Sequence, residues 1–208
     1  ICFGFAPAML FPKSFEDPYQ HFAAIQTCCH NTPYESFETF LPEDESMRKL
    51  CIQSMQKNEI KLHYNAPGIF QIDGEFNPCS ENPEYRKNAL NLAKKHICYA
   101  AEAESPIIVF AACPDKGIKK RPELLKRFME YFLELAELCR TYHMEITIEP
   151  IERHRFKKLI LGPFKDCADF MLEAQKNGAA NAHLMIDTAH LPLMEESLET
   201  AIKETQRA

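Results

Sequence analysis

Glycine is scarce in this chain: only 6 of its 208 residues are glycine, and neither a G-x-G-x-x-G stretch nor a Walker loop occurs. Nucleotide-binding doubly wound folds use such glycine-rich turns to bring the backbone close to phosphate groups. Their absence removes these folds from the leading interpretations.

Cysteine pairs with metal-binding spacing are also absent. The nine cysteines are scattered along the chain, and none forms a C-x-x-C pair. An odd number of cysteines without metal-type spacing, in a domain of this size, indicates reduced thiols that mostly fill the core. We therefore expect a cytoplasmic protein.

The sequence has neither long apolar runs nor an excess of basic residues. No run reaches the ~18 apolar residues of a membrane span, and no charged-then-apolar leader opens the chain. The net charge of -6 gives no electrostatic reason to expect nucleic acid or an anionic membrane as a partner. The chain starts without methionine, so we expect its natural start to lie upstream.

Strand and helix patterns alternate six times along the chain. The apolar patterns predict strands at 1–6, 34–40, 60–65, 107–112, 144–149 and 182–187. Helices are expected from Pro18, over 43–58, from Pro83, over 122–142, from Pro163 to Asn177, and over 193–206. Such alternation predicts an α/β fold with a parallel sheet covered by helices.

The closest architecture to this pattern is a (β/α)₈ TIM barrel, which typically needs ~250 residues. Six βα units are recognisable over 1–208. We therefore expect one barrel domain over 1–208 that is seen without its last two βα units. The segments 1–6 and 183–187 would then be open sheet edges, and the segment alone would be an incomplete functional unit.

The stretch from Met144 to His190 carries the chemistry. It reads as a strand ending at Glu149, a helix, and a strand ending at Asp187, with His190 three residues further on. Strands of a βαβ unit are parallel, so both acids should lie at the C-terminal ends of nearby strands, where α/β proteins place their chemistry. Two carboxylates and an imidazole there predict a divalent-metal and acid–base site. The alternative, that these acids cap neighbouring helices, stays open.

The segments I-E-P-I-E-R and M-I-D-T-A-H-L resemble the xylose-isomerase-like TIM barrels, which include sugar isomerases, ketose 3-epimerases and inosose dehydratases. This resemblance implies that Glu149 and Asp187 bind one divalent ion (manganese, magnesium or cobalt, less expectedly zinc) and that His190 contacts substrate. The family takes its other two metal ligands from the seventh and eighth strands, which we expect beyond residue 208. One departure stands out: ketose 3-epimerases carry a second glutamate where this chain has Arg155.

The resemblance implies a metal-dependent isomerase, epimerase or related dehydratase. Its substrate would be a small sugar, sugar phosphate or polyol, and Glu149 would move a proton through an enediolate. One alternative is a zinc-dependent apurinic endonuclease, which shares the barrel and the D-x-x-H motif, although the segment 110–113 lacks the histidine expected there and the charge is negative. Another is a non-catalytic sugar-binding barrel. Homo-oligomerisation is compatible with the sequence.

Four further residues are candidate substrate contacts. Arg153 and Arg155 follow Glu149 closely and could bind a phosphate or carboxylate, although a solvated basic loop explains them equally well. His63 and Glu38 lie near the ends of two earlier strands, where a structural role is the alternative.

Overall fold

The structure, a computed structural model, describes residues 3–31, 33–66 and 74–208. Six parallel strands form one sheet in the order β1-β2-β3-β4-β5-β6, so each strand pairs with the next along the chain. The strands are β1 (Gly4–Phe5), β2 (Ser36–Thr39), β3 (Lys61–Asn65), β4 (Ile107–Ala111), β5 (Glu145–Glu149) and β6 (Ala182–Leu184). The predicted α/β architecture is confirmed.

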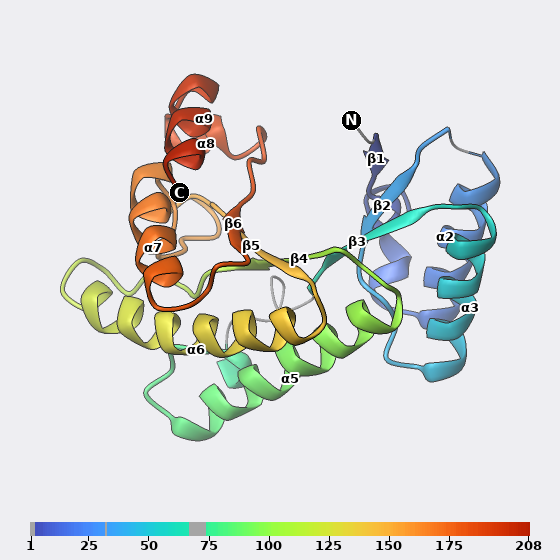
Figure 1. Cartoon of the computed structure of the whole chain (residues 1–208), viewed down its shortest axis with the longest axis horizontal. Coiled ribbons are helices and arrows are strands. Elements are labelled where there is room, and N and C mark those ends of the chain that lie inside the picture. Colours follow the sequence, from blue (N-terminus) through green and yellow to red (C-terminus); the bar gives the residue numbers. More distant parts are fainter. Residues whose placement is uncertain (1–2, 32, 67–73) are drawn as a thin grey trace.

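Helices connect the strands and lie on the outer side of the curved sheet (Figure 1). The elements are α1 (Pro7–Leu10), η1 (Pro12–Phe15), α2 (Pro18–Asn31), α3 (Glu45–Lys57), η2 (Gly74–Phe76), α5 (Pro83–Glu102), α6 (Arg121–Thr141), α7 (Phe164–Lys176), α8 (Leu191–Met194) and α9 (Leu198–Arg207). The predicted start of α2 is confirmed, because the Tyr19 backbone N–H donates to Asp17 Oδ1 at 2.8 Å. Among the described residues, no helix combines the length and apolar character that crossing a membrane requires.

The end of the predicted sixth strand and the last helix differ from expectation. β6 ends at Leu184 rather than Asp187, although the Met185 N–H still donates to the Ile148 carbonyl at 2.9 Å. The expected helix over 193–206 is two helices, because Glu195 adopts a left-handed conformation after α8. Ser197 then caps α9 by accepting a hydrogen bond from the Thr200 N–H at 3.1 Å.

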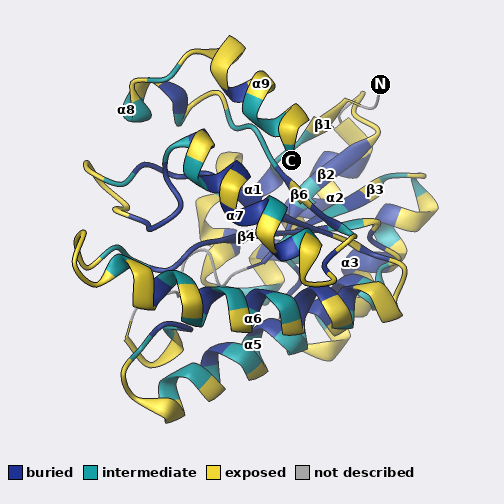
Figure 2. Cartoon of the chain, turned by 60° about the vertical axis from the view of Figure 1, so that its left-hand side comes forward, coloured by how far each residue is buried: buried dark blue, intermediate teal, exposed yellow. Residues whose placement is uncertain are grey.

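The core lies between the sheet and the helices (Figure 2). Four of the five residues of β4 and four of the five of β5 are buried, as expected for parallel strands covered by helices. On the helix side, the Phe170 ring of α7 lies 5.5 Å from Phe128 and 5.7 Å from Phe132 of α6, centroid to centroid. Glu149 is therefore the last residue of a strand held on a closely packed scaffold.

Candidate metal centre

Glu149, Asp187 and His190 converge at the C-terminal ends of β5 and β6. One ligand atom from each residue lies within 4.8 Å of those of the other two. His190 Nε2 lies 3.3 Å from Glu149 Oε1 and 3.6 Å from Asp187 Oδ2. The structure thus brings together the three residues that the sequence placed at one site.

A turn after β6 sets the positions of Asp187 and His190. The Ala189 N–H donates to Asp187 Oδ1 at 2.8 Å, and the His190 N–H donates to the Asp187 carbonyl at 3.2 Å. This aspartate turn begins three residues after β6 ends at Leu184. It also commits Oδ1 to the backbone and leaves Oδ2 facing the imidazole.

The site is partly enclosed and its groups interact strongly. Burial raises the pKa of Glu149, and this effect outweighs the opposing hydrogen bond from His190; the charges of Asp187 and Glu38 raise the pKa further. The hydrogen bond to Glu149 raises the pKa of His190 against the effect of burial. A carboxylate that is both buried and close to other acids favours a positive partner.

The donor set fits a divalent cation. Carboxylate oxygens suit manganese and magnesium, and an imidazole nitrogen adds a ligand acceptable to manganese and cobalt. Within the described residues, Glu149, Asp187 and His190 form the one group of three or more His, Cys, Asp or Glu side chains with such spacing. With Glu149 and Asp187 as the ligands, room remains around an ion for substrate oxygens, which the neighbouring His190 can reach.

Glu38 and His63 lie on the same face of the sheet as each other, because they are paired in the register of β2 and β3. Asn65 Nδ2 donates to Glu38 Oε1 at 2.7 Å. Burial lowers the pKa of His63, and the charge of Glu38 opposes that shift. Glu38 also acts on the pKa of Glu149, so it belongs to the electrostatic surroundings of the site. A substrate contact by either residue stays a prediction.

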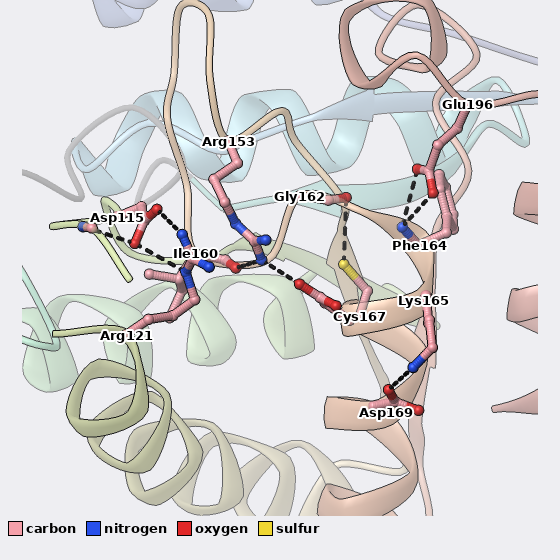
Figure 3. Close-up of polar contacts among 12 residues, drawn as sticks. Asp115, Arg121, Arg153, Ile160, Gly162, Phe164, Lys165, Cys167, Asp169 and Glu196 are labelled. Carbon is pink, nitrogen blue, oxygen red and sulfur yellow. Dashed lines mark hydrogen bonds and ion pairs between the residues drawn. The ribbon is translucent and has the colours of Figure 1, made fainter. Parts of the chain in front are cut away.

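Both arginines of the β5–α7 loop are bound to carboxylates of the chain itself. Arg153 is 7% exposed, and its Nη2 donates to Asp166 Oδ2 and to the Ile160 carbonyl, both at 2.6 Å (Figure 3). Arg155 is exposed and donates to Glu195 Oε1 at 2.9 Å. The structure therefore shows a role for Arg153 in holding the loop against α7. Binding of a substrate anion by these arginines stays a prediction.

Glu152 is a residue of this site that the sequence pattern did not single out. Its side chain is 1% exposed, and Oε1 accepts hydrogen bonds from the backbone N–H groups of Phe156 at 2.9 Å and Lys157 at 2.6 Å. Oε2 lies 3.9 Å from His190 Nδ1. The available signal was the second glutamate of I-E-P-I-E-R, but its basic neighbours suggested a solvated loop.

The fold and the motif-bearing strands define a TIM barrel of the xylose isomerase-like class. The sequence profile described as "Xylose isomerase-like TIM barrel" matches residues 22–206. The chain therefore belongs to the xylose isomerase-like TIM barrel family. The comparison with curated proteins found no sequence match.

Solved structures share this fold. A D-psicose 3-epimerase from Clostridium cellulolyticum H10, with D-tagatose, superimposes with a TM-score of 0.76 at 18% identity, covering 99% of this chain and 70% of that one. A D-allulose 3-epimerase from Methylomonas sp., with D-allulose, gives 0.78 at 15% identity, covering 99% and 68%. An AP endonuclease of family 2 from Brucella melitensis gives 0.77 at 13% identity, covering 98% and 75%. At such identities the likeness establishes the fold alone.

Proposed function

We propose that this protein is a divalent-metal-dependent isomerase or epimerase of a small sugar, sugar phosphate or polyol. The observation that carries the proposal is the convergence of Glu149, Asp187 and His190 at the strand ends of a xylose isomerase-like barrel. Solved epimerases of the same fold, captured with D-tagatose and D-allulose, support a sugar as the ligand.

Glu149 and Asp187 would hold the ion, a manganese, magnesium or cobalt ion, through Glu149 oxygens and Asp187 Oδ2. Such an ion, when bound, polarises a substrate carbonyl and makes the neighbouring C–H more acidic. Asp187 keeps Oδ1 in its turn, so its free oxygen is already oriented when an ion arrives.

Glu149 would also move the proton. Glu149 ends β5 with its side chain largely buried, and a carboxylate held beside the acidified C–H can accept its proton. The C–H proton would pass to a Glu149 oxygen while the C–H electron pair forms the C=C bond of an enediolate and the carbonyl π pair moves onto oxygen. Return of the proton from Glu149 to the neighbouring carbon would complete an isomerisation. An epimerisation would take its returning proton from a second acid on the opposite face, which the family resemblance places beyond residue 208. His190, beside Glu149, would contact the substrate oxygen that gains negative charge.

Exchange of substrate hydrogen with solvent tests this proposal directly. The chain, loaded with Mn²⁺, is incubated in D₂O with a panel of ketoses, ketose phosphates and sugar acids, and deuterium at carbon is measured by NMR. We expect exchange with at least one class, and a loss of ~10²–10⁴-fold in Glu149→Gln, because a general base contributes about that much. Glu137→Gln, which changes an exposed carboxylate bound to Arg140 outside the site, is the control and should keep full exchange.

Two alternatives have separate outcomes. An endonuclease, suggested by the fold shared with the Brucella protein, would nick abasic-site DNA, which the net charge of -6 disfavours. A non-catalytic sugar-binding barrel would bind a sugar and leave its hydrogens unexchanged.

A further inference from the structure

Two buried polar atoms face each other behind the candidate metal centre. Glu152 Oε2 and His190 Nδ1 are both buried, and neither has a hydrogen-bond partner within the described part of the chain. They lie 3.9 Å apart. Buried polar groups in native proteins are nearly always hydrogen-bonded, because leaving one unpaired costs free energy.

The other oxygen of Glu152 is fixed by the backbone. Oε1 accepts from the N–H groups of Phe156 and Lys157, so the carboxylate plane is anchored in the β5–α7 loop. Only Oε2 is then free to bind the imidazole. A shift of about 1 Å brings it within the ordinary N–H···O distance of His190 Nδ1.

We propose that Glu152 is a positioning residue: it accepts a hydrogen bond from Nδ1–H of His190 and so directs Nε2 toward Glu149 and Asp187. A carboxylate on one ring nitrogen fixes both the orientation of a histidine and the place of its proton. The arrangement joins the β5–α7 loop to the turn after β6, because one carboxylate binds backbone of the first and a side chain of the second. The consequence for turnover, as distinct from the hydrogen bond, rests on the proposed function.

Replacement by glutamine reverses the polarity of this contact. The two backbone N–H groups require an acceptor, so in Glu152→Gln the carbonyl oxygen of the new side-chain amide must face the loop and its NH₂ group must face the ring. An NH₂ group donates, and Nδ1 must then carry a lone pair instead of a proton. Glu152→Gln therefore keeps the loop anchor and removes the proton from Nδ1, whereas Glu152→Ala loses both.

Nitrogen-15 NMR of histidine side chains reads the proton directly. The chain is labelled with ¹⁵N-histidine and studied without metal, and the His190 resonances are assigned from their disappearance in His190→Asn. We expect Nδ1 in the protonated range in the wild type and in the unprotonated range in Glu152→Gln, with unchanged protection of the loop amides of Phe156 and Lys157. An unprotonated Nδ1 in the wild type, or a protonated Nδ1 in Glu152→Gln, would overturn the proposal.

Kinetics test the functional consequence separately. With any substrate that passes the deuterium-exchange assay, kcat should fall ~10–100-fold in Glu152→Gln, the usual range for a residue that orients a group at a metal site. KM and the affinity for Mn²⁺ should change by less than about threefold, because Glu152 touches neither. An unchanged kcat alongside the expected NMR shift would overturn the positioning role. Absence of activity in the wild type would count against the proposed function alone, since the NMR result needs no turnover.

Discussion

Tyr64 Oη lies 2.7 Å from His96 Nδ1, with both side chains buried between β3 and α5. The hydroxyl also accepts a hydrogen bond from the Leu41 N–H at 3.3 Å, so its own proton is available to His96. Nδ1 of a neutral His96 can accept that proton. Burial, with a smaller contribution from Lys95, lowers the pKa of His96 from its ordinary value near 6.5 to about 4.

This lowered pKa predicts a loss of stability in mild acid. Between pH 6.5 and 4 the unfolded chain binds a proton that the native His96 does not, so the free energy of unfolding decreases as the pH falls. The contribution of His96 to the free energy of unfolding is complete above pH ~6.5 and is lost near pH 4. Its total is about 3 kcal/mol. We therefore measure the free energy of unfolding by urea titration at several pH values for the wild type and for His96→Gln. As the pH falls from 6.5 to 4, this free energy should decrease more in the wild type than in His96→Gln. An equal decrease in both proteins would show that protonation of His96 does not affect stability.

The ion pair of Arg153 with Asp166 predicts a local stability effect. Asp166→Asn leaves a buried guanidinium without its countercharge, which is more costly than losing an exposed pair. Because Asp166 is 43% exposed, the expected loss is about 1–3 kcal/mol, below the full cost of breaking a buried pair. Urea unfolding measures it.

The matched control for Asp166 is the exposed pair on the next turn of α7. Lys165 binds Asp169 at 2.8 Å with both side chains in solvent, and such pairs contribute little. Lys165→Ala should leave the unfolding midpoint unchanged. Equal losses in Asp166→Asn and Lys165→Ala would contradict a special role for the buried guanidinium.

The exposed pair of Arg155 with Glu195 leads to a prediction about substrate charge. If Arg155 binds an anionic group of the substrate, Arg155→Glu should abolish turnover of a sugar phosphate or sugar acid and affect a neutral ketose less. Glu195→Gln removes the competing carboxylate and should lower KM for the anionic substrate only. Steady-state kinetics with both substrate types measure these effects. An equal loss of turnover on the anionic and the neutral substrate in Arg155→Glu would contradict anion binding by Arg155.

Sequence patterns predicted the order of the strands and the convergence of Glu149, Asp187 and His190. Both predictions need only short stretches of sequence, because apolar periodicity marks each strand and the strands of a βαβ unit lie parallel. The turn at Asp187 was missed, since an apolar run alone does not show where a strand leaves its ladder and a side-chain oxygen begins a turn. The position of Glu152 depends on tertiary contacts across two loops. Glu152 is buried although its neighbours in the sequence are mostly polar, so no local sequence pattern predicts its burial.

Binding of Mn²⁺ to the metal-free chain, followed by electron paramagnetic resonance, tests the central claim most directly. The account predicts one bound equivalent, with affinity reduced at least ~10-fold in both Glu149→Gln and Asp187→Asn, since each removes a charged ligand. Glu145→Gln is the control, because Glu145 lies at the opposite end of β5 and binds His183; it should bind Mn²⁺ as the wild type does. Equal binding in the wild type, Glu149→Gln and Asp187→Asn, or no binding in the wild type, would contradict the account.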